Sequence, residues 1–178
     1  IRSVYAALRA RGTEFERFRL GARDQFRQLD AANARRGFSV FNLCANGRYV
    51  RKDGSVRDLF AHLVAKGKTK FNENAMSCGM IVSYGKFRYF TAGDFSGRAT
   101  LADGTDVYPE TLLGKAAGRV NVAKIDHHGF HSMREELLRG LQARVYVASI
   151  WDQYHMTVDT LTRLSDRSIY PGERLIAP

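Results

Sequence analysis

Residues 80–94, MIVSYGKFRYFTAGD, carry the strongest structural signal in the sequence. Two runs of β-branched and aromatic residues flank the pair Gly85-Lys86, and this pattern predicts a β-hairpin. Strand-like runs follow at 120–125 and 145–150, separated by helix-like segments that we expect to begin at Pro109, Ser132 and Thr157. Because strands alternate with helices here, the sequence predicts the α/β class.

The rest of the chain shows weaker patterns. We expect a helix over 2–11, short strands around 14–19 and 25–29, a strand at 38–43 ended by Asn46-Gly47, a helix begun by the capping box Ser55-x-x-Asp58, and a last strand at 168–170. No segment rich in Pro or Ser marks a boundary, so we treat residues 1–178 as a single domain.

Size and composition exclude several classes of protein. The chain has 178 residues, 44% hydrophobic and 11% aromatic, so it can bury a core and is not disordered throughout. No run of about 18 uncharged apolar residues is present, which argues against a membrane span. No apolar signal-peptide core follows the first residues. Two cysteines, Cys44 and Cys78, are too few for a disulfide framework or a four-ligand zinc site, so we expect a reducing, cytoplasmic location.

The positive charge lies in the N-terminal half. The net charge is +10, from 28 Lys and Arg against 18 Asp and Glu. Residues 1–36 hold nine Arg against four acidic residues, residues 48–70 hold seven Lys and Arg against two, and the remainder is balanced. Such a half suits a nucleic acid partner, because neutralising phosphates releases counterions. A solvated basic face that only keeps the protein soluble explains the charge equally well.

Two expected strand ends carry unusual polar residues. The hairpin ends in Thr91-Ala-Gly-Asp94, and the next strand ends in Asp126-His127-His128-Gly129. Strand ends are where α/β proteins build sites, and carboxylate with imidazole is a ligand set for Zn²⁺, Mn²⁺ or Fe. Taken singly, Asp94 is more typical of a turn residue, and a lone histidine is more typical of a surface or core residue. Asp126 fits either an acceptor that orients an imidazole or a solvated strand-end residue.

Over residues 72–164 the order of these motifs resembles metallo-β-lactamase-fold hydrolases. The closest branch is the hydrolase domain of ComEC-like DNA-uptake channel proteins. That branch shows Asn-x-Asn-Ser, a hairpin, Thr-Gly-Asp, then Val-Gly-His-His-Gly-Ser, a helix, a strand, and a histidine before another helix. Here the corresponding residues are Asn72-Glu-Asn74, Asp94, His127-His128-Gly129 and Tyr154-His155-Met156.

The resemblance implies a four-layer αββα sandwich and roles for individual residues. Asp94 takes the place of the metal-bridging aspartate, His128 that of the last metal-binding histidine, and His127 is the alternate. His155 matches a late histidine that touches substrate or stabilises the leaving group. The cofactor implied is a divalent metal, Zn or Mn, two per complete domain. Asn72 and Asn74 stand where many relatives carry a metal-binding histidine, although an amide is a poorer ligand; we count both, with Tyr154, as candidate substrate contacts.

The family segment His-x-His-x-Asp-His is absent from the sequence. Because that segment holds most ligands of the first metal, we expect the domain to be incomplete at its N-terminus. The alternatives are that part of the chain is missing from the printed sequence, or that this is a degenerate member that no longer binds two metals.

Three functions compete at this stage. The first is a metal-dependent hydrolase, a nuclease or phosphodiesterase, with Asp94, His128 and His155 as its catalytic residues. The second is a non-catalytic domain of the same fold that binds nucleic acid or a protein partner. The third is hydrolysis of a small lactone or thioester, which only the basic charge disfavours. Trp151 and Tyr154 follow a strand and suit either packing or the stacking of a base.

Overall fold

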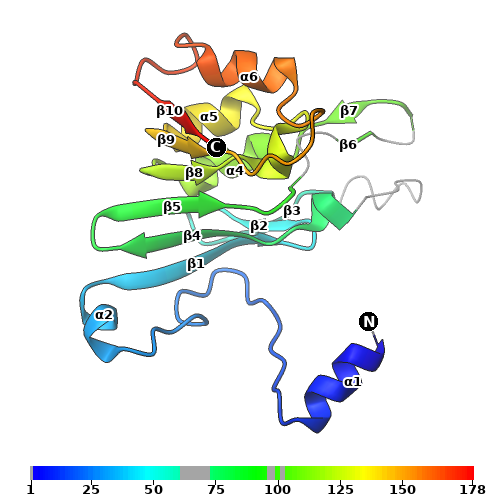
Figure 1. The fold of residues 1–178 in the computed structure, drawn as a ribbon, viewed down its shortest axis with the longest axis vertical. Coiled ribbons are helices and arrows are strands. Elements are labelled where there is room, and N and C mark those ends of the chain that lie inside the picture. The colour runs from blue at the N-terminus through cyan, green and yellow to red at the C-terminus, as the bar shows by residue number, and fades with distance from the viewer. Residues whose placement is uncertain (1, 61–72, 96–98, 101–102) are drawn as a thin grey trace.

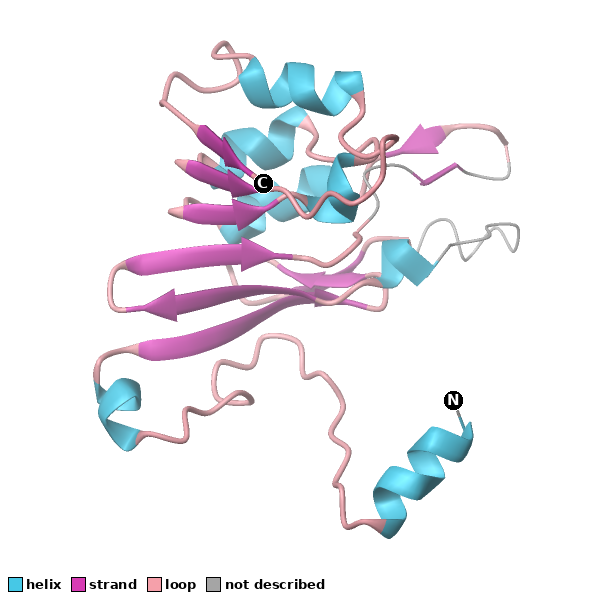
Figure 2. Ribbon diagram, viewed as in Figure 1, coloured by secondary structure: helices cyan, strands magenta, loops and turns pink. Residues whose placement is uncertain are grey.

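A computed structural model describes residues 2–60, 73–95, 99–100 and 103–178, and it confirms the α/β class. One eight-stranded sheet forms the centre of the molecule, and helices cover one of its faces (Figures 1 and 2). Its strands are β1 (Phe38–Ala45), β2 (Arg48–Val50), β3 (Val56–Asp58), β4 (Gly79–Tyr84), β5 (Phe87–Thr91), β8 (Val122–Lys124), β9 (Val145–Val147) and β10 (Leu175–Ala177).

The sheet is mixed, in the order β10-β9-β8-β5-β4-β1-β2-β3. The hairpin predicted from residues 80–94 is confirmed, with Ile81 opposite Phe90 in the β4–β5 register. On one side of this hairpin the strands β5, β8, β9 and β10 run parallel; on the other side β4, β1, β2 and β3 pair antiparallel. The carboxyl ends of the four parallel strands therefore lie along one edge of the sheet.

Three helices connect the parallel strands: α4 (Glu110–Ala117), α5 (Glu135–Leu141) and α6 (Val158–Ser165). Each crossover moves one strand further in the same direction, from β5 to β8, β9 and β10. Because such connections are almost always right-handed, crossovers that step the same way place their helices on the same face. The helices at Pro109 and Thr157 are confirmed, with these two residues immediately before their first turns.

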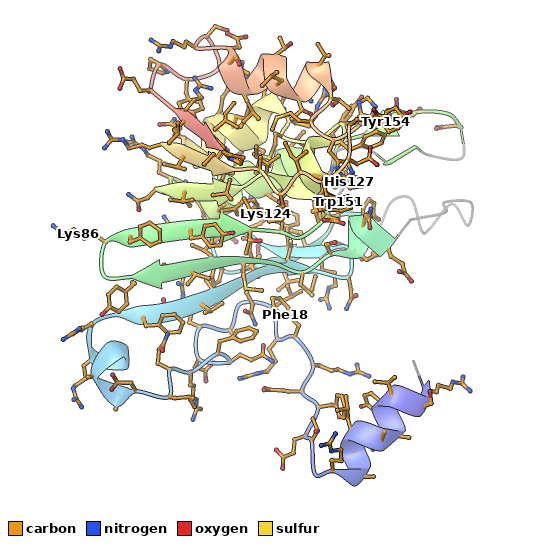
Figure 3. All side chains as sticks on the ribbon, viewed as in Figure 1. Phe18, Lys86, Lys124, His127, Trp151 and Tyr154 are labelled. Atoms are coloured by element: carbon orange, nitrogen blue, oxygen red, sulfur yellow. The ribbon has the colours of Figure 1, made fainter. Side chains whose placement is uncertain are left out.

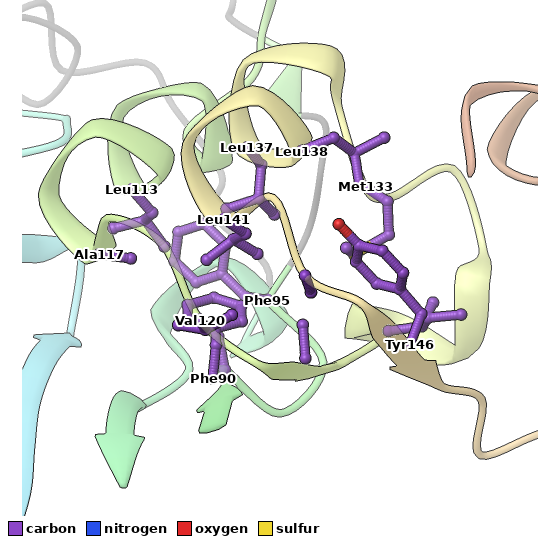
Figure 4. Close-up of a cluster of buried hydrophobic side chains, with 14 of the residues drawn as sticks. Phe90, Phe95, Leu113, Ala117, Val120, Met133, Leu137, Leu138, Leu141 and Tyr146 are labelled. Atoms are coloured by element: carbon purple, nitrogen blue, oxygen red, sulfur yellow. The ribbon is translucent and has the colours of Figure 1, made fainter. Parts of the chain in front are cut away.

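The core lies between this face of the sheet and the helices (Figure 4). Ile81, Phe90, Ala123 and Tyr146 are register partners on successive strands, and each is at most 1% exposed. The helices pack against them with buried apolar residues: Leu113, Ala117, Leu137, Leu138, Leu141 and Leu164. Helices α4 and α5 touch at Gly114, where a Cβ atom would overlap the backbone of α5.

The opposite face of the sheet is also apolar but less covered. Its register partners alternate with the core row: Val40, Val82, Tyr89, Val122, Val145 and Leu175. Val40 is buried, the four central residues are partly exposed, and Leu175 is 61% exposed. Among the helices of the described chain, none is long and apolar enough to cross a membrane.

The N-terminal segment corrects two expectations. Helix α1 (Arg2–Ala10) is confirmed but stands apart from the sheet and buries none of its residues (Figure 1). The short strands expected around 14–19 and 25–29 are wrong: these residues form no strand, and a short helix, α2 (Ala31–Arg35), follows them. The segment reaches the sheet through two backbone hydrogen bonds with Asn42 of β1: the Gly21 amide donates to the Asn42 carbonyl, and the Asn42 amide donates to the Ala22 carbonyl. These are too few pairs for a strand.

Three other element expectations are corrected. Residues 56–58 form strand β3 rather than a helix, because they pair with β2. The later part of that expected helix lies outside the described residues, as does the segment Lys66-Gly-Lys-Thr-Lys70, which the sequence predicts to be a basic loop. Helix α5 begins at Glu135 and not at Ser132, whose hydroxyl donates to the carbonyl of Asp126 at 2.6 Å. The last strand is Leu175–Ala177 rather than 168–170.

The described residues do not form the two stacked sheets of the αββα sandwich that the resemblance implies. Besides the large sheet they form one short pair, β6 (Ala99–Thr100) and β7 (Asp106–Val107). The observed architecture is an α/β layer with a mixed sheet.

Candidate functional site

The candidate site lies at the carboxyl ends of three neighbouring parallel strands (Figure 3). Asp94 follows β5, His127 and His128 follow β8, and Trp151 and His155 follow β9. Since parallel strands end at the same edge of a sheet, residues far apart in the sequence meet there. The structure thus brings together Asp94, His128 and His155, as the sequence predicts.

Asp94 and His128 form the centre of this site. The Nε2 atom of His128 lies 3.2 Å and 3.3 Å from the two carboxylate oxygens of Asp94. The Nδ1 atom lies 2.7 Å from the carbonyl oxygen of Ser149, which can only accept a hydrogen bond, so Nδ1 carries a proton. In a neutral imidazole Nε2 would then be an acceptor that faces a second acceptor. A cation between Nε2 and the Asp94 carboxylate would satisfy both ligand atoms.

The turn that carries the histidines has an unusual backbone. His127 (φ 47°) and His128 (φ 54°) both adopt the left-handed conformation, which costs a non-glycine residue about 1–2 kcal/mol each. Gly129 (φ 79°) follows, and a Cβ atom there would lie 2.9 Å from the Cα atom of Met156. The amide of Met156 donates to the carbonyl of His128 at 3.0 Å. The turn is thus held by the loop after β9, and it aims His128 at Asp94.

His127 points to a different partner. The side-chain amide nitrogen Nδ2 of Asn74 lies 3.2 Å from Nε2 of His127 and donates a hydrogen bond to it. Burial lowers the pKa of His127, and the Asp94 carboxylate opposes this only in part. Of the two histidines, His128 is therefore the one joined to Asp94. Asn72 lies outside the described residues.

His155 and two aromatic residues border this centre. The rings of His155 and His128 are stacked, with centroids 4.8 Å apart and planes at 24°. Trp151 meets His128 and His155 edge-on, at centroid distances of 4.0 Å and 4.5 Å. The Nδ1 atom of His155 is buried and has no hydrogen-bond partner among the described residues. Tyr154 lies nearby and is 71% exposed (Figure 3).

Lys124 is a site residue that the sequence analysis missed. Its ammonium group donates to the carbonyl oxygens of Gly93 (2.8 Å) and Ile125 (3.1 Å) and lies 4.0 Å from the Asp94 carboxylate. It therefore ties the end of β5 to the end of β8 and partly offsets the charge of Asp94. Its place as the last residue of an apolar strand, two residues before Asp126-His127-His128, is the signal that could have identified it.

Asp126 lies beneath the site and is not solvated. It is fully buried, and neither carboxylate oxygen has a hydrogen-bond partner among the described residues. Burial raises its pKa well above 3.8, and the nearby Glu110 raises it further; the Ala92 amide lowers it but lacks the geometry of a hydrogen bond. No hydrogen bond joins Asp126 to His127 or His128. This excludes both roles considered for it from the sequence.

The residues fit a metal ion in part. Asp94 and His128 supply a carboxylate oxygen and an imidazole nitrogen at one point, and the Ser149 carbonyl orients the imidazole as metal-bound histidines require. Within the described ranges no three His, Cys, Asp or Glu side chains come close enough to hold a metal. The site thus offers two protein ligands for one ion.

A separate cavity lies away from these residues. It has a volume of about 700 Å³ between the β2–β3 hairpin and α4, and none of the predicted site residues lines it. Its lining side chains include four cations and two acids: Arg51, Lys52, Arg57, Lys115, Asp53 and Asp58.

Comparisons with known proteins add no family to these observations. No protein-family model matches the chain, and no curated protein matches it. The function must therefore be inferred from the residues of the site.

Proposed function

We propose that the protein is a metal-dependent hydrolase that uses a metal-activated water to cleave a phosphodiester in a nucleic acid or nucleotide. One observation carries this proposal: Nε2 of His128 faces the Asp94 carboxylate at 3.2 Å while Nδ1 is committed to the Ser149 carbonyl. This arrangement leaves a place for a cation between two ligand atoms. To hold this arrangement, His127 and His128 both adopt the left-handed backbone conformation, which costs free energy.

Asp94 and His128 would hold the metal, Zn or Mn, and Asp94 would bridge to a second ion in a complete dinuclear site. When bound, such an ion supplies a Lewis acid that activates water for attack on phosphorus. Lys124 fixes the Asp94 loop through its hydrogen bond to Gly93, so that the carboxylate is oriented before substrate arrives. His155, which is stacked on His128, would give a proton to the leaving oxygen.

Two further features support a phosphodiester substrate and a two-sheet sandwich architecture. Residues 1–36 carry nine Arg against four acidic residues, which favours a polyanionic substrate over a small lactone or thioester. The apolar sheet face that carries Val82, Tyr89 and Val122 is the face that the second sheet of a metallo-β-lactamase-like sandwich would cover. We propose that architecture for the domain.

The alternative is a non-catalytic domain of the same fold that binds nucleic acid or a protein. It is favoured by the presence of only two converging ligands within the described residues. The two functions differ in whether loss of the Asp94 carboxylate abolishes hydrolysis.

The test uses the variant Asp94→Asn, which keeps the shape of the side chain but removes its charge. Asp166→Asn is the matched control, since Asp166 accepts a hydrogen bond from Ser168 at the end of α6, away from the site. Hydrolysis of bis(4-nitrophenyl) phosphate is measured with added Mn²⁺ or Zn²⁺, with metal content after gel filtration and folding by circular dichroism. We expect Asp94→Asn to remain folded, to lose bound metal, and to lose about 100-fold or more of the activity. Equal activity in both variants would refute the hydrolase.

A further inference from the structure

We propose that Trp151 forms a stacking platform for an unpaired base, and that the substrate strand is therefore single-stranded at the site. This inference rests on the proposed function, because it assigns the base next to the phosphodiester that Asp94 and His128 would bind. It adds the strandedness of the substrate and one residue, Trp151, that selects for it.

The first observation is the exposure of the two rings. Trp151 is 72% exposed and Tyr154 is 71% exposed, whereas the three other aromatic residues after β8, namely Phe130, Tyr146 and Tyr170, are 40% exposed or less. A large aromatic ring that stays exposed to water contributes only a small part of the stabilising free energy that its burial would supply. These two rings therefore contribute little to the core, and their flat apolar surfaces are available to a ligand.

The second observation is the position of Trp151. The indole of Trp151 meets the ring of His128 at a centroid distance of 4.0 Å, so it borders the Asp94–His128 centre directly. His155, on the same loop, lies 4.5 Å from the indole. A nucleotide whose phosphate occupies the centre would place its base within reach of this ring, because the base is carried by the sugar to which that phosphate is attached.

The third observation is that the loop is held in place. The Asp152 side chain accepts a hydrogen bond from the Tyr154 amide at 2.8 Å, and its carbonyl accepts one from the His155 amide at 3.0 Å. The amides of Met156 and Thr157 donate to the carbonyls of His128 and Gly129, each at 3.0 Å. The platform is thus fixed to the turn that carries His128, and little ordering remains to be done on binding.

Stacking on a side chain requires a base with a free face. In a duplex both faces of an internal base are covered by its neighbours, and exposing one costs unstacking energy. A single strand or a frayed end presents such a face without that cost, and stacking on an aromatic side chain tolerates any base sequence. The geometry therefore favours single-stranded nucleic acid over a duplex.

Trp151 is the only tryptophan in the chain, so its fluorescence reports directly on the platform. The probes are a ten-residue thymidine oligonucleotide, an abasic oligomer of the same length and charge, and a blunt duplex, titrated without added divalent metal to prevent cleavage. We expect the thymidine strand to quench the fluorescence, and the abasic strand and duplex to quench it far less. Equal quenching by all three probes, or none by any, would overturn the proposal.

Variants separate stacking from charge. Binding of fluorescein-labelled strands is measured by anisotropy for Trp151→Ala, Trp151→Phe and the control Val158→Ala, since Val158 is 80% exposed on α6. Trp151→Ala should weaken binding of the thymidine strand roughly 5- to 150-fold and leave the abasic strand unchanged, whereas Trp151→Phe should restore most of the affinity. Equal loss for both strands would overturn the platform. Stacking without any metal-dependent hydrolysis would refute the enzyme alone, and hydrolysis that is abolished by Asp94→Asn but shows no preference for single strands would refute the platform alone.

Discussion

Glu110 gives the protein a pH-dependent stability that can be measured. Its carboxyl group is fully buried at the first residue of α4 and accepts hydrogen bonds from the amides of Met133 (3.2 Å) and Arg134 (3.1 Å). Burial raises its pKa from 4.5 to about 7, although both hydrogen bonds act in the opposite direction. Between these two values the folded protein keeps a proton on Glu110 that the unfolded chain has lost.

The raised pKa determines the sign of the effect. The stabilisation is fully present below pH 4.5 and is lost as the pH rises through about 7, because the unfolded state then binds fewer protons than the folded state. Each pKa unit is worth ~1.4 kcal/mol, so the whole effect is about 3 kcal/mol. Of this, about 2.5 kcal/mol falls between pH 5 and pH 8.

The variant Glu110→Gln removes the titrating proton and keeps a carbonyl oxygen that can accept one of the two amides. Urea unfolding, followed by circular dichroism at pH 5, 6, 7 and 8, gives the free energy of unfolding for both proteins. We expect the free energy of unfolding of the wild type to fall by about 2.5 kcal/mol relative to that of the variant between pH 5 and pH 8. Because the Glu110 carboxylate raises the pKa of Asp126, the substitution Asp126→Asn is introduced into both proteins, so that the titration of Asp126 does not contribute to the difference. Glu135→Gln on the exposed face of α5 is the matched control. Parallel curves for wild type and Glu110→Gln would refute the reasoning.

Two stability predictions follow from the site and the core. Gly129→Ala should lower the free energy of unfolding by about 2 kcal/mol or more, because the new Cβ atom meets Met156 in a left-handed turn; an unchanged urea midpoint would contradict this. Leu137→Ala should cost about 2–5 kcal/mol, since the side chain is fully buried, whereas Leu161→Ala, which is 44% exposed, should cost under about 1 kcal/mol in the same assay. Equal losses in the two leucine variants would show that the core is not where the structure places it.

The sequence predicts the second half of the fold well because its local signals agree with the tertiary contacts. The Gly85-Lys86 turn joins two strands that pair with each other, and Leu137, Leu138 and Leu141 bury the face of α5 that their spacing predicts. The Ser132 capping box fails for a tertiary reason. The Ser132 hydroxyl donates to the Asp126 carbonyl, and the amides of Met133 and Arg134 donate to the Glu110 carboxylate instead.

The first half is predicted less well because its local signals compete. Ser55 and Asp58 resemble a helix start, but Ser55 bonds to Asp53 and Asp58 caps the Phe60 amide, while Val56–Asp58 adds to the edge of β2. The aromatic residues at 15–26 resemble strands, but only two residues of that segment, Gly21 and Ala22, find backbone partners on β1. Pairing of this kind depends on distant residues that a local pattern does not contain.

The site follows the same rule. Asp94 and His128 can be predicted to meet because each directly follows a strand of the parallel set. The partner of each histidine ring cannot be predicted, because it depends on loops that are distant in the sequence. Asn74 donates a hydrogen bond to His127, the Ser149 carbonyl orients His128, and Trp151 packs against both His128 and His155. The Asp126 carboxyl group is buried without a hydrogen-bond partner among the described residues, and this depends on tertiary packing that a local pattern does not contain.

The single direction of the crossovers also has a consequence for folding. The strands β5, β8, β9 and β10 lie side by side in the order in which the chain is made, so each of them pairs with the preceding strand of this set. The β4–β5 hairpin requires only a two-residue turn to close, and it presents a ready edge to β8. This half of the sheet can therefore grow by one unit at a time from the hairpin toward the C-terminus, without waiting for a distant segment.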